Sequence, residues 1–373
     1  MPAASPTLDL SDVAALAVDE HRAAPAAVVA AVHLRDGVQV RGIGAAGRLW
    51  YADDAPLAGV DTLFDLASVT KPVTALALAR LGARSRLHRG ELLGEVLPAL
   101  AATRSGRVPL DLLASHRAGL DGHRQLYAPL LQGLAVDPAA SLRIAADARR
   151  ADCEGDPPPQ GFPPVYSDLG YLLLGAALAA RAGDDLDRIL DREVLAPLGL
   201  TIGSARQLRA RVDFDARVAP TETVGWRGGT VRGAVHDENA WALARDAAAG
   251  HAGLFGDARA VVDLGVAILD ALAGRGDAIL GPADLEPVLR DRPGGSLLAG
   301  FDRRSGENPT SGPRFGARTF GHLGFTGTSL WIDPDAQLVG VLLTNRVHPT
   351  RDGDAIRRAR PAVYAALAER MLR

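Results

Sequence analysis

Residues 64–72 read FDLASVTKP and place Ser68 three positions before Lys71, at the start of a helix expected over residues 67–81. Because residues three apart lie on one side of a helix, the hydroxyl and the amine can meet. A serine hydroxyl becomes an effective nucleophile when a neighbour removes its proton, and an uncharged lysine amine can do this. Pro72 cannot donate an N–H, which predicts that the helix is bent or begins late.

The position of this pair at a helix start predicts two electrostatic effects. The partial positive charge of the helix N-terminus disfavours an ammonium, so we expect a lowered pKa for Lys71. The free N–H groups there also point toward a developing oxyanion. Lys71 is the only lysine among 41 lysines and arginines, and a lysine, unlike an arginine, can lose its proton in a protein. The alternative is a serine near a helix start followed by an exposed lysine.

Two further motifs carry candidate groups. Tyr166-Ser167-Asp168 follows a Pro-rich loop and opens a helix expected over residues 167–181. A phenol beside a cationic lysine can become a phenolate and transfer protons. The alternative is that Ser167 or Asp168 caps the helix while Tyr166 packs against it. Residues 321–329, GHLGFTGTS, predict a strand edge that supplies a second oxyanion N–H and pairs with an extended substrate.

The order of elements predicts an α+β fold, an α/β sandwich. Early and late strands would form one antiparallel sheet flanked by the N- and C-terminal helices, and the helical middle would form an inserted subdomain. We expect a sheet subdomain of residues 1–75 and 215–373, a helical subdomain of residues 76–214, and an active site between them. The expected elements are helices at residues 9–23, 186–198 and 354–373 and strands at residues 26–34, 38–43, 62–66, 318–322, 328–333 and 338–345.

Two local features refine this layout. Arg35-Asp36-Gly37 predicts the turn of the first hairpin. Pro361 is expected to split or kink the last helix, because a proline inside a helix removes a hydrogen bond.

In this order the motifs resemble those of the serine β-lactamase and penicillin-binding protein superfamily, and most of all its class C-like β-lactamases, D,D-peptidases and esterases. The resemblance covers about residues 63–349 and includes residues 112–120, LLASHRAGL, which look like that family's loop near the active site. Residues 235–240 and 250–255 look like a subgroup of bacterial serine hydrolases. The resemblance implies a β-lactamase/transpeptidase-like fold and a hydrolase without cofactor or metal.

The resemblance also implies roles for individual residues. Ser68 would be acylated, and Lys71 and Tyr166 would move protons. The backbone N–H groups of Ser68 and Phe325 would form the oxyanion hole.

Substrate binding is expected at four positions, two of which depart from the family. Asp168 stands where the family has Asn, and His322 stands where it has Lys, with Gly324 two residues further on. Arg346, just past the last strand, would replace the missing cation, and His322 would bind substrate or relay a proton. These departures argue against efficient β-lactam hydrolysis, so the expected substrate is a small ester, a peptide or, with weak activity, a β-lactam.

Other functions remain as alternatives. The same departures fit a binding or sensory protein that keeps the fold without turnover. Residues 42–47, GIGAAG, fit a dinucleotide fingerprint, but residues 48–51 predict a strand instead of the required helix. His236, Asp237 and Glu238 are potential metal ligands, but adjacent side chains rarely point at one centre, so we expect loop hydrogen bonds from them.

Composition narrows the choice of partners. A net charge of −3 gives no reason to expect nucleic acid. The longest apolar run, residues 171–180, is too short to span a membrane. Cys153 is the only cysteine, so it has no intramolecular disulfide partner. The first residues lack a signal-peptide pattern, which predicts a cytoplasmic protein, or a periplasmic one if the start codon is mis-called.

Overall fold

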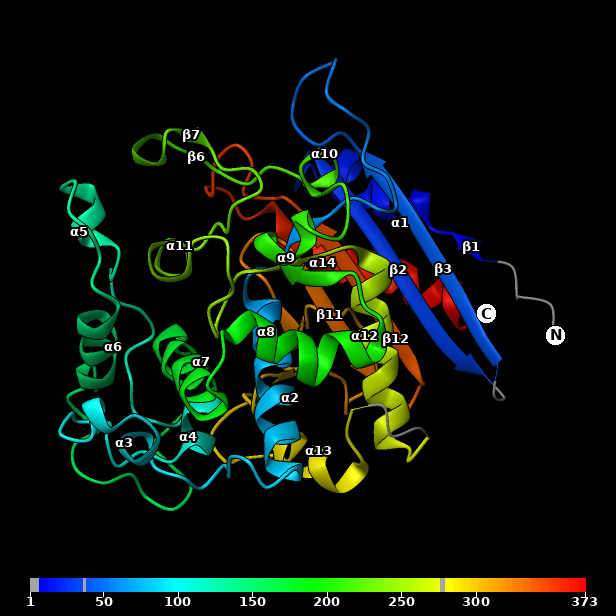
Figure 1. Ribbon diagram of the computed structural model, residues 1–373. Coiled ribbons are helices and arrows are strands. Elements are labelled where there is room, and N and C mark those ends of the chain that lie inside the picture. Colours follow the sequence, from blue (N-terminus) through cyan, green and yellow to red (C-terminus); the bar gives the residue numbers. More distant parts are fainter. Residues whose placement is uncertain (1–6, 36–37, 276–278) are drawn as a thin grey trace.

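A seven-stranded sheet unites the two ends of the chain in the computed structural model, which describes residues 7–35, 38–275 and 279–373. The strand order is β1-β3-β2-β12-β11-β10-β9, and every neighbouring pair is antiparallel except β1 and β3. Figure 1 shows the blue early strands beside the orange late strands. The strands are β1 (Leu8–Asp9), β2 (Ala26–Arg35), β3 (Val38–Gly47), β9 (Asp302–Arg303), β10 (Phe320–Leu323), β11 (Ser329–Asp333) and β12 (Leu338–Thr344). The expected antiparallel sheet is confirmed, whereas Asp36 and Gly37 of the expected turn lie outside the described residues.

The central strand β2 is apolar on both faces because helices cover both. Alternate side chains of a strand point to opposite faces, and Val28 and Val32 join one hydrophobic cluster while Val29 joins another. Helix α12 (Ala258–Leu272) packs on the first face. Helices α1 (Ser11–Ala15) and α14 (Ala355–Met371) pack on the second. The expected cover of N- and C-terminal helices is therefore confirmed, with α12 as a further layer.

The terminal helices differ in detail from the expectation. Helix α14 runs unbroken through Pro361, so the expected split is wrong. Its side chains Val363, Tyr364 and Leu367 are fully buried against the sheet, which anchors the helix beyond the proline. At the other end α1 begins only at Ser11, because the preceding residues form β1, and it continues as a π-helical turn, Leu16–Glu20.

The glycines of residues 42–47 lie within β3, and no helix follows them. A Cβ at Gly44 would lie 2.1 Å from the backbone of Leu10. The glycine is therefore required for close approach of the N-terminal segment, and the dinucleotide interpretation is not supported by the local fold.

Helix α2 (Thr70–Ala83) forms the centre of the helical region, and its first ten residues are all buried. A helix buried on all sides lies within the core, and here α7, α8 and α13 surround it. Figure 1 shows α3 to α6 further from the seven-stranded sheet. The expected division at residues 75/76 stays a prediction, and it would cut α2.

The remaining elements complete the region around the site. The helices are α3 (Leu93–Val96), α4 (Leu110–Ala114), α5 (Ala128–Leu131), α6 (Pro138–Asp147), α7 (Asp168–Ala182), α8 (Leu186–Leu190), α9 (Ala205–Arg209), α10 (Phe214–Arg217), α11 (Glu238–Ala244) and α13 (Pro282–Leu289). Two small sheets contain β4 (Phe64–Asp65), β8 (Leu254–Gly256) and β5 (Ile202–Ser204), and β6 (Thr223–Val224) with β7 (Gly229–Thr230). None of the helices in the described ranges has the length and apolar character needed to cross a lipid bilayer.

Candidate active site

The segment before Ser68 is held in an unusual bend. Ala67 has a φ of 47°, a left-handed conformation that a residue with a Cβ rarely adopts. The buried carboxylate of Asp65 accepts the Ala67 N–H at 2.8 Å and the His236 N–H at 2.7 Å. A short 3-10 turn, Ala67–Val69, follows, and α2 begins at Thr70. The late start that Pro72 predicts is therefore confirmed.

The Ser68 hydroxyl and the Lys71 amine meet across this turn. Lys71 Nζ lies 2.8 Å from Ser68 Oγ, 2.7 Å from Asp168 Oδ1 and 3.2 Å from the carbonyl oxygen of His251. The lysine side chain is 0% exposed. The alternative of an exposed lysine is therefore wrong, and each of the three ammonium protons has an acceptor.

The expected lowering of the Lys71 pKa is wrong. Burial does lower the pKa of Lys71. The charges of Asp168 and Tyr166 and their hydrogen bonds to the amine have a larger combined effect, however, and raise the pKa above the ordinary lysine value. The physical reason is the carboxylate of Asp168, which forms an ion pair with the amine. Lys71 is consequently an ammonium in the resting protein.

Tyr166 covers this pair as an uncharged phenol. Its ring centroid lies 4.8 Å from Lys71 Nζ, and the His116 ring stacks on it at 4.7 Å. Burial raises the pKa of Tyr166, and the charge of Lys71 opposes that effect without overcoming it. Tyr166 is therefore a phenol in the resting protein, and its role in proton transfer stays a prediction. Capping is confirmed as well, since Ser167 Oγ accepts the Gly170 N–H at 3.2 Å.

The end of β10 lies against the nucleophile segment. Thr326 and Thr328 donate their hydroxyl hydrogens to the carbonyls of Asp65 at 2.7 Å and Leu66 at 3.0 Å. A Cβ at Gly324 would lie 2.0 Å from Thr328 Oγ1, so this close packing requires glycine. Within the described ranges, the N–H groups of Ser68 and Phe325 donate to no protein acceptor. Neither group is therefore satisfied by another part of the described chain, and their role as an oxyanion hole stays a prediction.

His322 does not replace the cation that the family has at its position. Its side chain is buried, and Nδ1 lies 2.8 Å from the Leu323 carbonyl. Burial and the nearby Lys71 charge lower the pKa of His322 to about 3. The imidazole is therefore neutral at physiological pH.

Two arginines approach the same strand edge. Arg346 lies over the Phe325 ring, 4.5 Å from its centroid, and donates from Nε to the Phe325 carbonyl at 2.8 Å. Arg360 of α14, which sequence reasoning missed, is buried and donates to the carbonyls of Gly324 at 2.8 Å and Thr328 at 3.0 Å. Nothing in the local sequence distinguishes Arg360 from the many other arginines of the chain.

A cleft of about 770 Å³ brings the predicted site residues together. Lys71 lies beneath its floor, fully buried. Every other residue predicted for the site lines the cleft: Ser68, Tyr166, Asp168, His322, Gly324, Phe325 and Arg346.

Three consecutive residues that line the cleft, His236, Asp237 and Glu238, bind three different partners. His236 Nε2 lies 3.0 Å from Glu222, Asp237 Oδ1 lies 2.9 Å from His251 Nε2, and Glu238 pairs with Arg351. The expected loop hydrogen bonding of this stretch is therefore confirmed, and its side chains do not converge on one centre.

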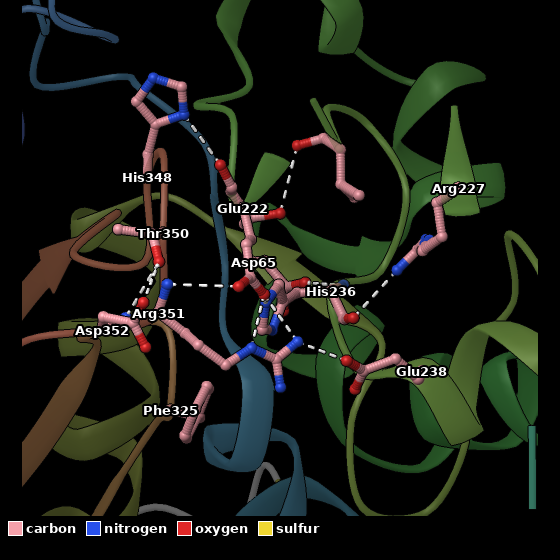
Figure 2. A network of polar contacts seen from close by, with 12 residues as sticks. Asp65, Glu222, Arg227, His236, Glu238, Phe325, His348, Thr350, Arg351 and Asp352 are labelled. Carbon is pink, nitrogen blue, oxygen red and sulfur yellow. Dashed lines mark hydrogen bonds and ion pairs between the residues drawn. The ribbon is translucent and has the colours of Figure 1, made fainter. Parts of the chain in front are cut away.

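Figure 2 shows how this stretch supports Phe325. Arg351 donates from Nε to Glu222 Oε2 at 2.6 Å, and Glu222 in turn contacts the His236 ring. The His236 ring stacks on Phe325 with a centroid distance of 5.8 Å. A chain of contacts thus links the loop after β12 to the strand edge beside Ser68.

A serine hydroxyl in contact with a fully buried lysine amine, at the edge of a cleft, is typical of an acyl-transfer hydrolase. The family model described as Beta-lactamase matches residues 14–365. The chain belongs to the beta-lactamase family, and it is a serine hydrolase that acts through an acyl-enzyme.

Two relatives by sequence share one description. A putative D-alanyl-D-alanine carboxypeptidase of Escherichia coli (strain K12) is 30% identical over 311 residues, which cover 77% of this chain and 70% of that protein. A protein with the same description from Salmonella agona (strain SL483) is 28% identical over 315 residues, which cover 78% and 71% of the two chains.

Solved structures share the fold. EstCE1, a hydrolase with promiscuous acyltransferase activity, is 24% identical with a TM-score of 0.67, over 95% of this chain and 97% of that one. A class C beta lactamase from Rhodobacter sphaeroides is 18% identical with a TM-score of 0.65, over 96% and 99% of the two chains. The expected β-lactamase/transpeptidase-like fold is thereby confirmed.

Proposed function

We propose that Ser68 is the acylated nucleophile of this hydrolase and Lys71 its general base. The distance of 2.8 Å between Lys71 Nζ and Ser68 Oγ, at a fully buried lysine, carries this proposal. Asp168, the second acceptor of the amine, keeps Lys71 protonated in the resting protein. Lys71 must therefore lose one proton before it can act as a base and remove the proton of Ser68.

Asp168 gives that first proton a route to water. Its carboxylate touches Lys71 Nζ, and its side chain is 23% exposed in the cleft. The uncharged amine of Lys71 then removes the Ser68 hydroxyl proton as Oγ forms a bond to the substrate carbonyl carbon. The electron pair of the carbonyl moves onto its oxygen, which the N–H groups of Ser68 and Phe325 stabilise.

Collapse of this intermediate forms the acyl-enzyme. The carbonyl bond re-forms as the bond to the leaving alcohol or amine breaks, and the proton held by Lys71 passes to the leaving group through the Tyr166 hydroxyl. In the second half a water molecule gives a proton to Lys71 and attacks the acyl carbon. Ser68 departs and recovers its proton from Lys71, which regenerates the enzyme.

We propose a small ester or D-peptide as the substrate. Asp168, His322, Gly324 and Arg346 line the cleft beside Ser68. The relatives described as putative D-alanyl-D-alanine carboxypeptidases support a peptide, and EstCE1, described as a hydrolase with promiscuous acyltransferase activity, supports a substrate that donates an acyl group, such as an ester. A neutral His322 and an anionic Asp168 argue against efficient β-lactam hydrolysis. The cytoplasmic location stays a prediction from the sequence.

Labelling with a fluorophosphonate probe tests the catalytic assignment. The wild-type protein is expected to be labelled at Ser68 and to turn over a p-nitrophenyl ester, and Ser68→Ala is expected to lose both. Lys71→Arg keeps the charge but cannot supply an uncharged base, so it is also expected to lose labelling. Ser305→Ala removes an exposed serine and is the matched control. Labelling that persists in Lys71→Arg would overturn the role of Lys71.

The raised pKa of Lys71 favours a second candidate, a binding or sensory protein that is acylated but hydrolyses its acyl-enzyme very slowly. A single equivalent of released p-nitrophenol without further turnover would support this function. Repeated turnover that Ser68→Ala removes would exclude it.

A further inference from the structure

A loop between α11 and β8 binds the face of α2 that carries Lys71. The carbonyl of Gly250 accepts the Thr74 hydroxyl at 2.8 Å, and the carbonyl of His251 accepts Lys71 Nζ at 3.2 Å. The N–H of Leu254 donates to Thr70 Oγ1 at 3.3 Å. Successive turns of α2 are thereby tied to one short loop.

This loop fits tightly against its surroundings. A Cβ at Gly250 would lie 2.0 Å from the Tyr171 carbonyl oxygen, and Gly253 has a φ of 112°. The loop closes on itself through a hydrogen bond of 2.9 Å from the Ala249 N–H to the Ala252 carbonyl. Its carbonyl groups therefore have a fixed direction as long as the loop stays in place.

The His251 side chain is anchored by Asp237. Its Nε2 lies 2.9 Å from Asp237 Oδ1, and its Nδ1 has no partner within the described ranges. The ring is buried at 2% exposure. The same Asp237 oxygen accepts the Ala240 N–H at 2.7 Å and caps α11. Asp237 is thus the one polar anchor of this imidazole in the described part of the chain.

We propose that Asp237 and His251 form a positioning pair that aims the Lys71 amine at Ser68. The inference rests on the proposed role of Lys71. An ammonium donates to Ser68 Oγ, Asp168 and the His251 carbonyl at once. After one proton leaves, the two remaining N–H groups donate to Asp168 and the His251 carbonyl, and the tetrahedral nitrogen then directs its lone pair toward Ser68 Oγ.

The acceptor on His251 is what makes this direction unique. Without the His251 carbonyl, the amine keeps Asp168 and the Tyr166 hydroxyl as neighbours but loses its third direction, so it can rotate about its Cε–Nζ bond and turn its lone pair away from the serine. Asp237 fixes the position of the His251 side chain through a hydrogen bond. Because the side chain is fixed, the backbone carbonyl of His251 keeps its direction toward Lys71. Burial raises the pKa of Asp237, but His251 outweighs burial and holds it well below its usual range, so the anchor is an ionised carboxylate.

Kinetics of Asp237→Ala, His251→Ala and the double variant test the pair. Misplacing a reacting group by about 1 Å can cost on the order of 100-fold in rate, so each single variant is expected to lose roughly tenfold to 100-fold in kcat, with KM changed by less than about twofold. Because the two residues act through one carbonyl, the double variant is expected to be no slower than the slower single variant. Multiplied losses in the double variant would overturn the pair.

Matched variants separate positioning from stability. Asp257 caps α12 by accepting the Ala260 N–H at 2.8 Å, as Asp237 caps α11. Asp257→Ala is therefore expected to lower the melting temperature as Asp237→Ala does, but to leave kcat unchanged. Asp237→Asn keeps a cap and an acceptor for His251, and it is expected to restore kcat to within a few-fold. His251→Ala leaves the caps of α11 and α12 intact. It therefore still tests the positioning pair if Asp237→Ala does not fold.

The outcomes distinguish this inference from the proposed function. Retained turnover in Ser68→Ala would overturn the function itself. Turnover that depends on Ser68 but is unchanged in His251→Ala would leave the function standing and overturn the positioning pair.

Discussion

The Lys71 amine and the Asp168 carboxylate form an ion pair of 2.7 Å at the floor of the cleft. The pair lies directly beside the Ser68 hydroxyl, 2.8 Å from the same amine. On the proposed role of Lys71 as the base, the proton that this pair holds must leave first, so we expect the charge of Asp168 to control the pH at which the site becomes active.

Asp168→Asn is expected to move the activity toward lower pH. Removal of the negative charge lowers the pKa of Lys71, so the uncharged amine forms at a lower pH. The acidic limb of kcat/KM against pH should shift to lower pH, and the rate at neutral pH should rise. Asp152→Asn alters an exposed carboxylate and serves as control. A limb that stays in place or moves upward would contradict the proposed role of Asp168.

The same ion pair predicts how stability depends on alkaline pH. The pKa of Lys71 is higher in the folded than in the unfolded chain, so the pair stabilises the fold below the unfolded value, about 10.4. This contribution is lost as the pH rises through the folded value. The melting temperature of the wild type should therefore fall more steeply above pH 10 than that of Asp168→Asn. Parallel curves for the two proteins would contradict this account.

His322 is expected to stay neutral across the physiological range. Burial and the Lys71 charge lower its pKa to about 3. In an NMR titration from pH 5 to 8 its ring signals, assigned by their loss in His322→Gln, should not move. Lys71→Met removes the cation and should raise the pKa of His322. A ring that titrates near 6.5 in the wild type would show that the imidazole is hydrated.

Glu222→Gln is expected to destabilise the network behind Phe325. Burial raises the pKa of Glu222, but hydrogen bonds from His236 and Arg351 outweigh burial and lower it to about 2. The carboxylate therefore stabilises the fold above its unfolded pKa, and this contribution is lost as the pH falls through about 2. We expect a loss of roughly 1–3 kcal/mol in the free energy of unfolding at pH 7.

Denaturant unfolding at several pH values measures this effect. The difference between Glu222→Gln and the wild type should shrink steadily as the pH is lowered from about 4 toward 2. Glu154→Gln changes an exposed side chain and should have no effect at either end. A difference that is independent of pH would mean that the variant acts by packing alone.

Ala67→Gly is expected to stabilise the protein. A residue with a Cβ at a φ of 47° is strained, by about 1–2 kcal/mol per residue, and glycine is not. Glycine costs about 0.5–1 kcal/mol in chain entropy, so the net gain should be up to about 1 kcal/mol. Ala83→Gly at the end of α2 has ordinary helical geometry and should instead lose stability. A loss in Ala67→Gly equal to that in Ala83→Gly would show that the bend is unstrained.

Local sequence patterns were enough to predict the sheet and the central motif. The apolar runs of β2 and β12 are typical of strands that are buried on both faces. The Ser68–Lys71 contact also follows from helical spacing alone. These features depend on neighbours within a few residues.

Features that depend on distant segments could not be predicted in the same way. The raised pKa of Lys71 depends on Asp168, 97 residues away, and on how close its carboxylate comes. The His251 carbonyl is 180 residues from Lys71. Arg360 lies on a helix whose other face packs on the sheet. In each case the feature depends on the distance between two groups that lie far apart in the sequence. Local sequence patterns contain no information about that distance.

The pairing of β2 with β12 has a consequence for synthesis of the protein. Ala27 lies opposite Thr344, so β2 cannot pair with β12 until residue 344 has left the ribosome. Until then the nascent hairpin of β2 and β3 presents an apolar, unpaired edge, a template for association with other chains. Cells that make this protein quickly should therefore need chaperones to shield that edge, and truncation before β12 should yield aggregates instead of a smaller enzyme.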